Sequence, residues 1–300
     1  MKQFKKLLVV LNPFDAFNIE VDHALRIAKS NDAEIDLVAF HHYSEISLLE
    51  RIKPEINIRE QIEKNTLDQI TQKIEPLIEK GIKINARIEW CNHITAAIFD
   101  LTKNTNYDLL IKAPNRYSPL KSMTTTPTDW TLLRTCPCPV WLARQETQFN
   151  QDILAAIDIG DESATNITIA TEIIHQANYL AHLLGRKLHI ITAFPAMPAA
   201  AQLQFVSIYE NDYLQEVKTR YSKVLDEILE PFDIPDNHRH VISGDADQVI
   251  YDYIKHNPAS VLVMGTAARE GVAGLLSGNT AERIINRVEC DLLVVRKPKV

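Results

Sequence analysis

The sequence lacks long apolar runs, and this excludes a membrane-spanning helix. No stretch of eighteen consecutive apolar residues occurs in the 300 residues. Near the N-terminus the apolar run from Leu7 to Leu11 is too short for the core of a secretory signal peptide. Cysteine is scarce as well, and four residues of this type indicate no disulfide framework. We therefore expect a cytoplasmic protein.

An excess of positive charge is also missing. Residues 1–148 contain 19 Lys and Arg against 19 Asp and Glu, whereas residues 149–300 contain 13 against 20. The net charge of −7 thus arises in the second half. Proteins that bind DNA or RNA need clustered basic residues to displace counterions from phosphates. We expect no nucleic acid as a direct partner.

The chain does contain an internal repeat. Residues 92–144 align without a gap with residues 244–296. In both halves, short runs rich in Val, Ile and Leu alternate with amphipathic helical patterns, including a long helical segment, 44–80, that Pro54 and Pro76 are expected to break. The expected strands are Lys6–Leu11, Glu34–Phe40, Lys83–Ile88, Asp108–Ala113 and Val140–Ala143, then Ile153–Ile157, Lys187–Ala193, Arg239–Ile242, Ser260–Met264 and Leu292–Val295.

This alternation predicts an α/β fold with two tandem domains, 1–147 and 148–300. Each is expected to be a doubly wound, five-stranded parallel sheet of the flavodoxin-like or Rossmann-like kind. In such sheets a ligand binds beyond the carboxyl ends of the strands, where the strand order reverses. The loops after the first and fourth strands of each domain are therefore the places to search for function.

Glycine is rare, but half of the eight glycines fall within fourteen residues: Gly265, Gly271, Gly274 and Gly278. Gly265 follows the fourth expected strand of the second domain, and Gly278 precedes a helix. Such a loop lets backbone N–H groups approach a phosphate closely. The alternative is a flexible loop in which Gly278 and Asn279 cap the helix without any ligand.

The loop, the order of elements and the repeat resemble the universal stress protein family over essentially the whole chain. Nucleotide-binding members of that family carry Gly-x2-Gly-x9-Gly-Ser/Thr after the fourth strand. Gly265 and Gly278 match its first and third glycines, while Ala268 replaces the second. The resemblance implies a second-domain site for ATP or AMP, with Mg²⁺ in the case of ATP, formed by Asp158, Ala193, Met264, Gly265, Thr266, Gly278, Asn279 and Thr280.

The first domain departs further from the nucleotide-binding pattern. Asn12 stands where the second domain has Asp158, and Ala113 where it has Gly265. The run TPTDWTLLRTCPCPVW, residues 126–141, resembles the two-domain, E-type members of the family. That resemblance implies an intramolecular pseudo-dimer in which Val140–Ala143 pairs with Leu292–Val295, and a further homodimer stays open.

The resemblance implies a stress-response protein without catalysis, one that senses a small-molecule ligand or binds protein partners. Three alternatives remain open. One is a weak Mg²⁺-dependent ATPase in which Asp158 contacts the metal. Another is a binder of an acyl-bearing molecule under the uncharged segment 193–208, and the third is a scaffold whose two sites are empty.

Cys136 and Cys138 form a C-x-C pair that is better explained by packing than by metal binding. His238 and His240 flank an expected edge strand and should face solvent. We expect no catalytic residues and no metal ligands.

Overall fold

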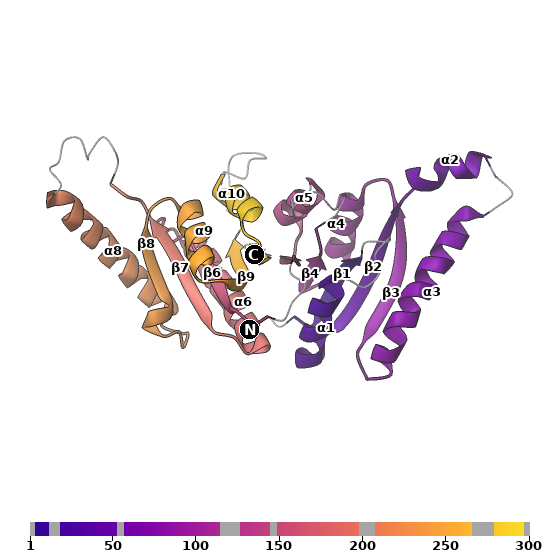
Figure 1. Ribbon diagram of the computed structural model, residues 1–300, viewed down its shortest axis with the longest axis horizontal. Coiled ribbons are helices and arrows are strands. Elements are labelled where there is room, and N and C mark those ends of the chain that lie inside the picture. Colours follow the sequence, from indigo (N-terminus) through magenta and orange to yellow (C-terminus); the bar gives the residue numbers. More distant parts are fainter. Residues whose placement is uncertain are drawn as a thin grey trace. The chain divides into compact units, whose positions relative to one another are not determined.

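Each half of the chain folds into a parallel β-sheet with helices on both faces (Figure 1). The computed structural model describes residues 4–11, 19–52, 57–114, 127–144, 149–197, 208–265 and 279–296. The chain divides into two compact units, Met1–Thr147 and Gln148–Val300.

The first unit has the strand order β3-β2-β1-β4-β5, and all neighbouring strands are parallel. Helix α1 packs against β1, β2 and β4, whereas α4 and α5 pack against each other. Its elements are β1 (Lys6–Leu11), α1 (Ile19–Asn31), β2 (Glu34–His42), α2 (Ser44–Ile52), α3 (Ile58–Ile78), β3 (Ile84–Cys91), α4 (Ile94–Asn104), β4 (Leu109–Lys112), α5 (Pro127–Thr135) and β5 (Val140–Leu142).

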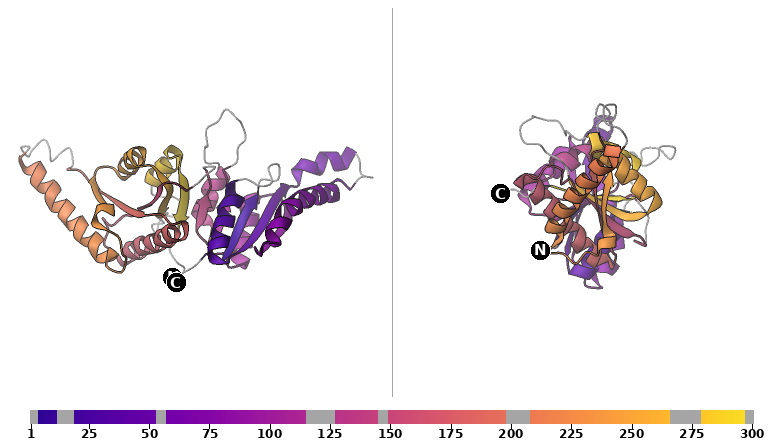
Figure 2. Two further views of the ribbon diagram at one scale, coloured as in Figure 1. Left: turned by 60° about the horizontal axis from the view of Figure 1, so that its bottom comes forward. Right: turned by 90° about the vertical axis from the view of Figure 1, so that its left-hand side faces the viewer.

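The second unit repeats this arrangement in the order β10-β9-β6-β7-β8, again with parallel neighbours. Helices α6 and α8 cover one face of the sheet, and α9 and α10 the other (Figure 2). Its elements are β6 (Asp152–Ala156), α6 (Ala164–Leu184), β7 (Leu188–Phe194), α8 (Ile208–Leu229), the 3-10 turn η1 (Asp236–His238), β8 (Arg239–Ser243), α9 (Ala246–His256), β9 (Ala259–Gly265), α10 (Asn279–Arg287) and β10 (Asp291–Val295).

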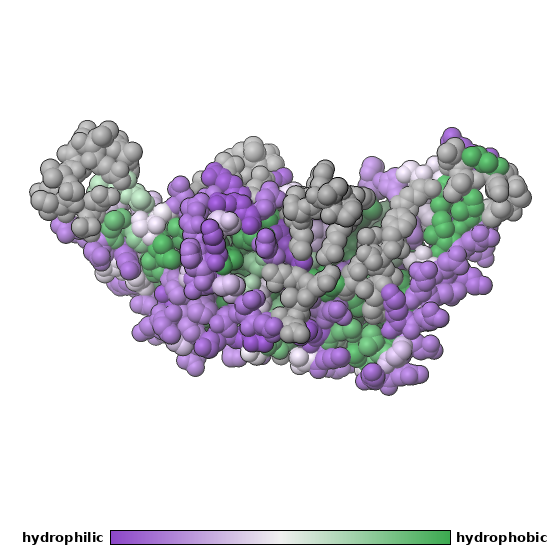
Figure 3. Space-filling view, viewed as in Figure 1, coloured by the Kyte–Doolittle hydropathy of each residue, from purple (hydrophilic) through white to green (hydrophobic). Residues whose placement is uncertain are grey.

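The central strands are apolar on both faces because helices cover both faces. Ile153, Leu154 and Ala155 of β6 are buried, as are Val261, Leu262 and Val263 of β9. The surfaces that face solvent are more polar than the strands, and the outward surfaces of α3 and α8 are mostly hydrophilic (Figure 3).

The strand order reverses between β1 and β4 in the first unit and between β6 and β9 in the second. This confirms the predicted α/β, doubly wound fold, and the order is that of the Rossmann-like kind. The carboxyl ends of β6, β7 and β9 therefore enclose the place where a ligand is expected.

Two sequence-based expectations need comment. The predicted break at Pro76 is wrong, because α3 continues to Ile78 with Pro76 in its last turn; the predicted break at Pro54 lies outside the described residues. The pairing of Val140–Ala143 with Leu292–Val295 concerns the placement of one unit relative to the other, and it stays a prediction. Within the described ranges, no helix has the length and apolar character needed to cross a bilayer.

Candidate functional site

The connection from β6 to α6 carries the acidic side of the candidate site. Asp158 is exposed just past the end of β6, and its Oδ1 accepts the backbone N–H of Gly160 at 3.0 Å. Asp161 accepts the N–H of Ser163 in the same way, and Ser163 caps α6. These short-range hydrogen bonds fix the loop and hold the Asp158 carboxylate at the carboxyl end of the sheet.

Tyr221 of α8 closes the outer side of this loop. A Cβ atom placed on Gly160 would lie only 2.5 Å from the Tyr221 hydroxyl, so the hydroxyl packs directly on the glycine. The ring also contacts Phe194 at the end of β7, with 5.7 Å between centroids. Burial, and then the negative charge of Asp158, raises the pKa of Tyr221. Tyr221 therefore stays a neutral hydroxyl beside Asp158.

The backbone of Ala193 faces the same place. In β7, Ile191 accepts the N–H of Ile157 on the β6 side, while Phe194 accepts the N–H of Gly244 on the β8 side. Alternate residues of a strand direct their backbone groups to opposite neighbours. Ala193, two residues beyond Ile191, thus directs its N–H and C=O toward β6, which has already ended at Ala156. One residue there presents both a donor and an acceptor.

Met264 and Gly265 end strand β9 on the other side of the reversal point. Met264 is buried and lies opposite Ala156 of β6. A Cβ on Gly265 would come within 3.0 Å of Ile173 and 3.2 Å of Ile169, both on α6. The close approach of α6 therefore favours glycine at position 265 whether or not a ligand binds.

The remaining predicted site residues are only partly covered. Thr266 and Gly278 lie outside the described residues. Asn279 and Thr280 begin α10, but their side chains are not among those described.

The described part of the site is acidic. Asp158, Asp161 and Glu162 are exposed, and Arg220 pairs with Glu162 at 2.6 Å. Carboxylates accept hydrogen bonds from hydroxyl groups, and the Ala193 backbone can pair with the edge of a planar base. These groups suit a ribose and a base rather than phosphates.

The first unit fills the corresponding position with its own ion pair. Lys112, at the end of β4, aligns with Met264, and Asp129 of α5 aligns with Ala281. The Lys112 ammonium lies 2.8 Å from Asp129, and the two side chains are 5% and 0% exposed. Lys112 also donates to the carbonyl oxygen of Ala113. A charged pair inside the protein thus occupies the end of this strand.

The sulfur atoms of Cys136 and Cys138 lie 3.5 Å apart, and both side chains are buried free thiols. The described residues contain no group of three His, Cys, Asp or Glu side chains that could hold a metal ion. These cysteines pack between α5 and β5 as small apolar residues.

Two features of the site were missed from the sequence. Tyr221 is separated from Asp158 by 63 positions, and nothing in its local pattern indicates the contact. The Lys112–Asp129 pair could have been found, because a lysine inside the apolar run LLIK aligns with a methionine in the second unit.

The universal stress protein family model matches residues 3–144 and 150–296. The chain belongs to this family. It is a universal stress protein of the tandem type, with one copy of the domain in each half. The universal stress protein E homolog of Haemophilus influenzae is 26% identical over 99% of both chains. Universal stress protein E of Escherichia coli strain K12 is 29% identical and covers 73% of this chain and 70% of its own length.

Solved structures agree with this assignment. A putative universal stress protein from Pseudomonas aeruginosa UCBPP-PA14 has a TM-score of 0.77 and 26% identity, covering 99% of this chain and 95% of its own. A universal stress protein from Archaeoglobus fulgidus shares the fold, with a TM-score of 0.62 and 17% identity over 98% of this chain.

Proposed function

We propose that this universal stress protein is a cytoplasmic, non-catalytic sensor of an adenine nucleotide, ATP or AMP, which binds to the second unit only. One observation carries the proposal: Asp158 lies just past the end of β6, and the Ala193 backbone lies at the end of the neighbouring strand β7, so both are at the carboxyl edge of the sheet where the strand order reverses. A carboxylate offers about four acceptor positions, and the Gly160 N–H uses one, so ribose hydroxyls can donate to the others.

The base and phosphate parts of the nucleotide have different partners in this proposal. The N–H and C=O of Ala193 pair with the edge of the adenine ring, and Met264 and Gly265 form the neighbouring strand end. Asn279 and Thr280 begin α10, where backbone N–H groups favour anions, and we propose them as phosphate contacts together with Thr266 and Gly278. Mg²⁺ enters as the counter-ion of ATP, because the described loop offers a single carboxylate, Asp158, next to the crevice.

The first unit serves as the contrasting case. Lys112 and Asp129 lie where the second unit has Met264 and Ala281, so we propose that no nucleotide binds there. One nucleotide per chain is the expected stoichiometry. We propose that occupancy alters the surface which the protein offers to its partners.

The test is equilibrium dialysis of the full chain against labelled ATP and AMP, with and without Mg²⁺. We expect one site per chain and a loss of at least tenfold in affinity for Asp158→Ala. Asp161→Ala is the matched control, because this exposed carboxylate of the same loop accepts the backbone N–H of Ser163 at the start of α6. Equal affinities for the three proteins would contradict the proposed site.

Native mass spectrometry of freshly purified protein, followed by denaturing extraction, tests the identity of the ligand. A retained adenine nucleotide supports the proposal. A retained acyl-bearing molecule would overturn it in favour of a lipid-like ligand. Magnesium-dependent release of ADP that disappears in Asp158→Ala would establish an ATPase instead.

A further inference from the structure

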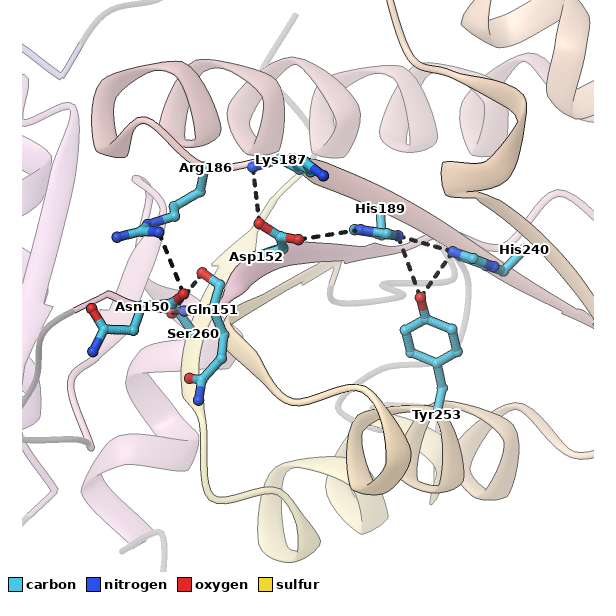
Figure 4. A network of polar contacts seen from close by, with 9 residues as sticks. All are labelled: Asn150, Gln151, Asp152, Arg186, Lys187, His189, His240, Tyr253 and Ser260. Atoms are coloured by element: carbon cyan, nitrogen blue, oxygen red, sulfur yellow. Dashed lines mark hydrogen bonds and ion pairs between the residues drawn. The ribbon is translucent and has the colours of Figure 1, made fainter.

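A cluster of two histidines, a tyrosine and an aspartate lies at the opposite end of the same sheet (Figure 4). Asp152 begins β6, His189 is the second residue of β7, and His240 is the second residue of β8. Tyr253 reaches the cluster from α9. These positions are at the amino ends of the strands, whereas the candidate nucleotide site is at their carboxyl ends.

The two imidazole rings of His189 and His240 meet edge to edge. Nδ1 of His189 and Nε2 of His240 are 3.1 Å apart, while the ring planes differ by 12° and the centroids are 5.3 Å apart. A centroid lies about 1.1 Å from each ring nitrogen, so the two nitrogens point almost directly at each other. The Tyr253 hydroxyl lies 2.9 Å from His240 Nε2 and 3.4 Å from His189 Nδ1.

This geometry leaves room for one ring proton between the imidazoles. A neutral imidazole has one N–H and one acceptor nitrogen, whereas a charged imidazolium has an N–H at both positions. If both rings were charged, two N–H groups would face each other across 3.1 Å. The contact therefore requires that at least one of the two rings stays neutral.

The surrounding charges add to this restriction. Asp152 lies 3.5 Å from His189 Nε2 and favours a proton there, but its other oxygen accepts the backbone N–H of Lys187. The ring of His238 is centred 4.2 Å from that of His189, and the Lys187 ammonium is a further positive neighbour. Arg239, next to His240, pairs with Asp226 of α8 and with Asp236. One carboxylate thus faces several cationic or potentially cationic groups.

We propose that the His189–His240–Tyr253 cluster is a proton-sensitive latch, which fastens β7 and β8 to α9 near neutral pH and releases them in acid. This inference does not depend on the nucleotide proposal. It corrects the sequence-based expectation that His240 faces solvent, since His240 is half-buried and hydrogen-bonded.

The direction of the pH effect follows from burial. Burial, and then the neighbouring His189 and His238, lowers the pKa of His240 to about 4. Burial, and then the charge of His238, also lowers the pKa of His189, although the negative charge of Asp152 acts in the opposite direction. In the unfolded chain, His189 and His240 bind protons with a pKa near 6.5. In the folded unit their pKa values are lower, so they stay neutral at that pH. Stability is therefore complete above about pH 6.5 and is lost progressively as the pH falls toward 4.

A metal ion does not explain the cluster. Two imidazole nitrogens on either side of a zinc ion, each at about 2.0–2.1 Å from it, are more than 3.1 Å apart unless the angle at the metal is below about 100°. Nitrogens that point directly at each other require an angle near 180°, which is a separation of about 4 Å. A shared proton fits the observed distance, and a metal does not.

The size of the effect can be bounded. With pKa values of about 4 in the folded state and 6.5 in the unfolded state, His240 alone increases the opening equilibrium up to about 20-fold between pH 7 and pH 5. Because the ring is only half-buried, we expect about tenfold.

The experiment measures hydrogen exchange of the full chain at pH 7 and pH 5, corrected for intrinsic rates, with peptides from β7, β8 and α9. The wild type should open about tenfold more at pH 5, whereas His240→Gln, which keeps a hydrogen-bonding amide but cannot titrate, should change less than about threefold. His256→Gln is the matched control, since that exposed histidine bonds to its own helix backbone and should behave like the wild type.

A parallel pH response in the wild type and in His240→Gln would overturn the proposal. If His240→Gln does not fold at pH 7, His189→Gln takes its place. A histidine NMR titration of the wild type gives a second, independent test: His240 must titrate more than one pH unit below the value of about 6.5 for an unperturbed histidine. A titration of His240 near pH 6.5 would contradict the latch whatever the exchange data show.

Discussion

Replacing Lys112 with methionine should destabilise the first unit strongly, because it removes the ammonium group that lies against the buried Asp129 carboxylate. The two side chains are 5% and 0% exposed and lie 2.8 Å apart. Removing one partner of a buried ion pair costs about 3–5 kcal/mol. For a unit of this size, about 2–4 °C is lost for each kcal/mol, so the unfolding midpoint should fall by about 6–20 °C.

The assay can follow the first unit separately. All three tryptophans, Trp90, Trp130 and Trp141, belong to it, so tryptophan fluorescence reports the unfolding of this unit. The double variant with Lys112→Met and Asp129→Ala reproduces the pair of residues found in the second unit, Met264 and Ala281. It should recover about half of the loss or more, since it removes both charges of the buried pair.

Lys83→Met is the matched control for this prediction. Lys83 forms an ion pair of nearly equal length with Asp32, at 2.7 Å, but the two side chains are 58% and 74% exposed. Its loss should therefore shift the midpoint far less than Lys112→Met. If Lys112→Met and Lys83→Met have the same small effect on the midpoint, the result would contradict the burial of the Lys112–Asp129 pair. A double variant less stable than Lys112→Met would also refute the reasoning.

Two further changes probe other parts of the chain. Gly160→Ala places a Cβ 2.5 Å from the Tyr221 hydroxyl and should lower stability by about 1–3 kcal/mol, measured by far-UV circular dichroism in urea; an unchanged midpoint would show that the tyrosine moves aside freely. In native protein a thiol reagent should modify Cys91 first, because Cys136 and Cys138 are buried; rapid modification of all three would contradict their burial.

The strands and the parallel, doubly wound sheets could be predicted because each strand is a compact run of apolar residues. Ile153–Ile157 and Ser260–Met264 need helices on both faces whatever their partners are, and the repeat shows the same need in the other half. Pro76 misled the prediction because a proline in the last turn disturbs few helical hydrogen bonds.

The site could be predicted only in part. Asp158 and Ala193 are indicated by the resemblance to the family, and the structure places Asp158 just after β6 and Ala193 near the end of β7. Tyr221 and His240 do not, because their partners come from elements distant in sequence, and the direction of each side chain is set by helix packing. Gly265 could be predicted, but the glycine alone does not indicate a ligand, since the loop motif and packing against α6 both favour glycine at this position.

The two ends of strand β7 carry groups of different kinds, His189 near its start and Ala193 near its end. Four residues of extended chain span about 13 Å. Screening by physiological salt reduces interactions between exposed charges beyond about 8 Å. The proposed nucleotide places its adenine, not its phosphates, at Ala193, so its charge would have only a weak electrostatic effect on the histidines at the other end of the strand. Coupling between the two ends of β7 would therefore act through a displacement of the strand, not through electrostatic interaction.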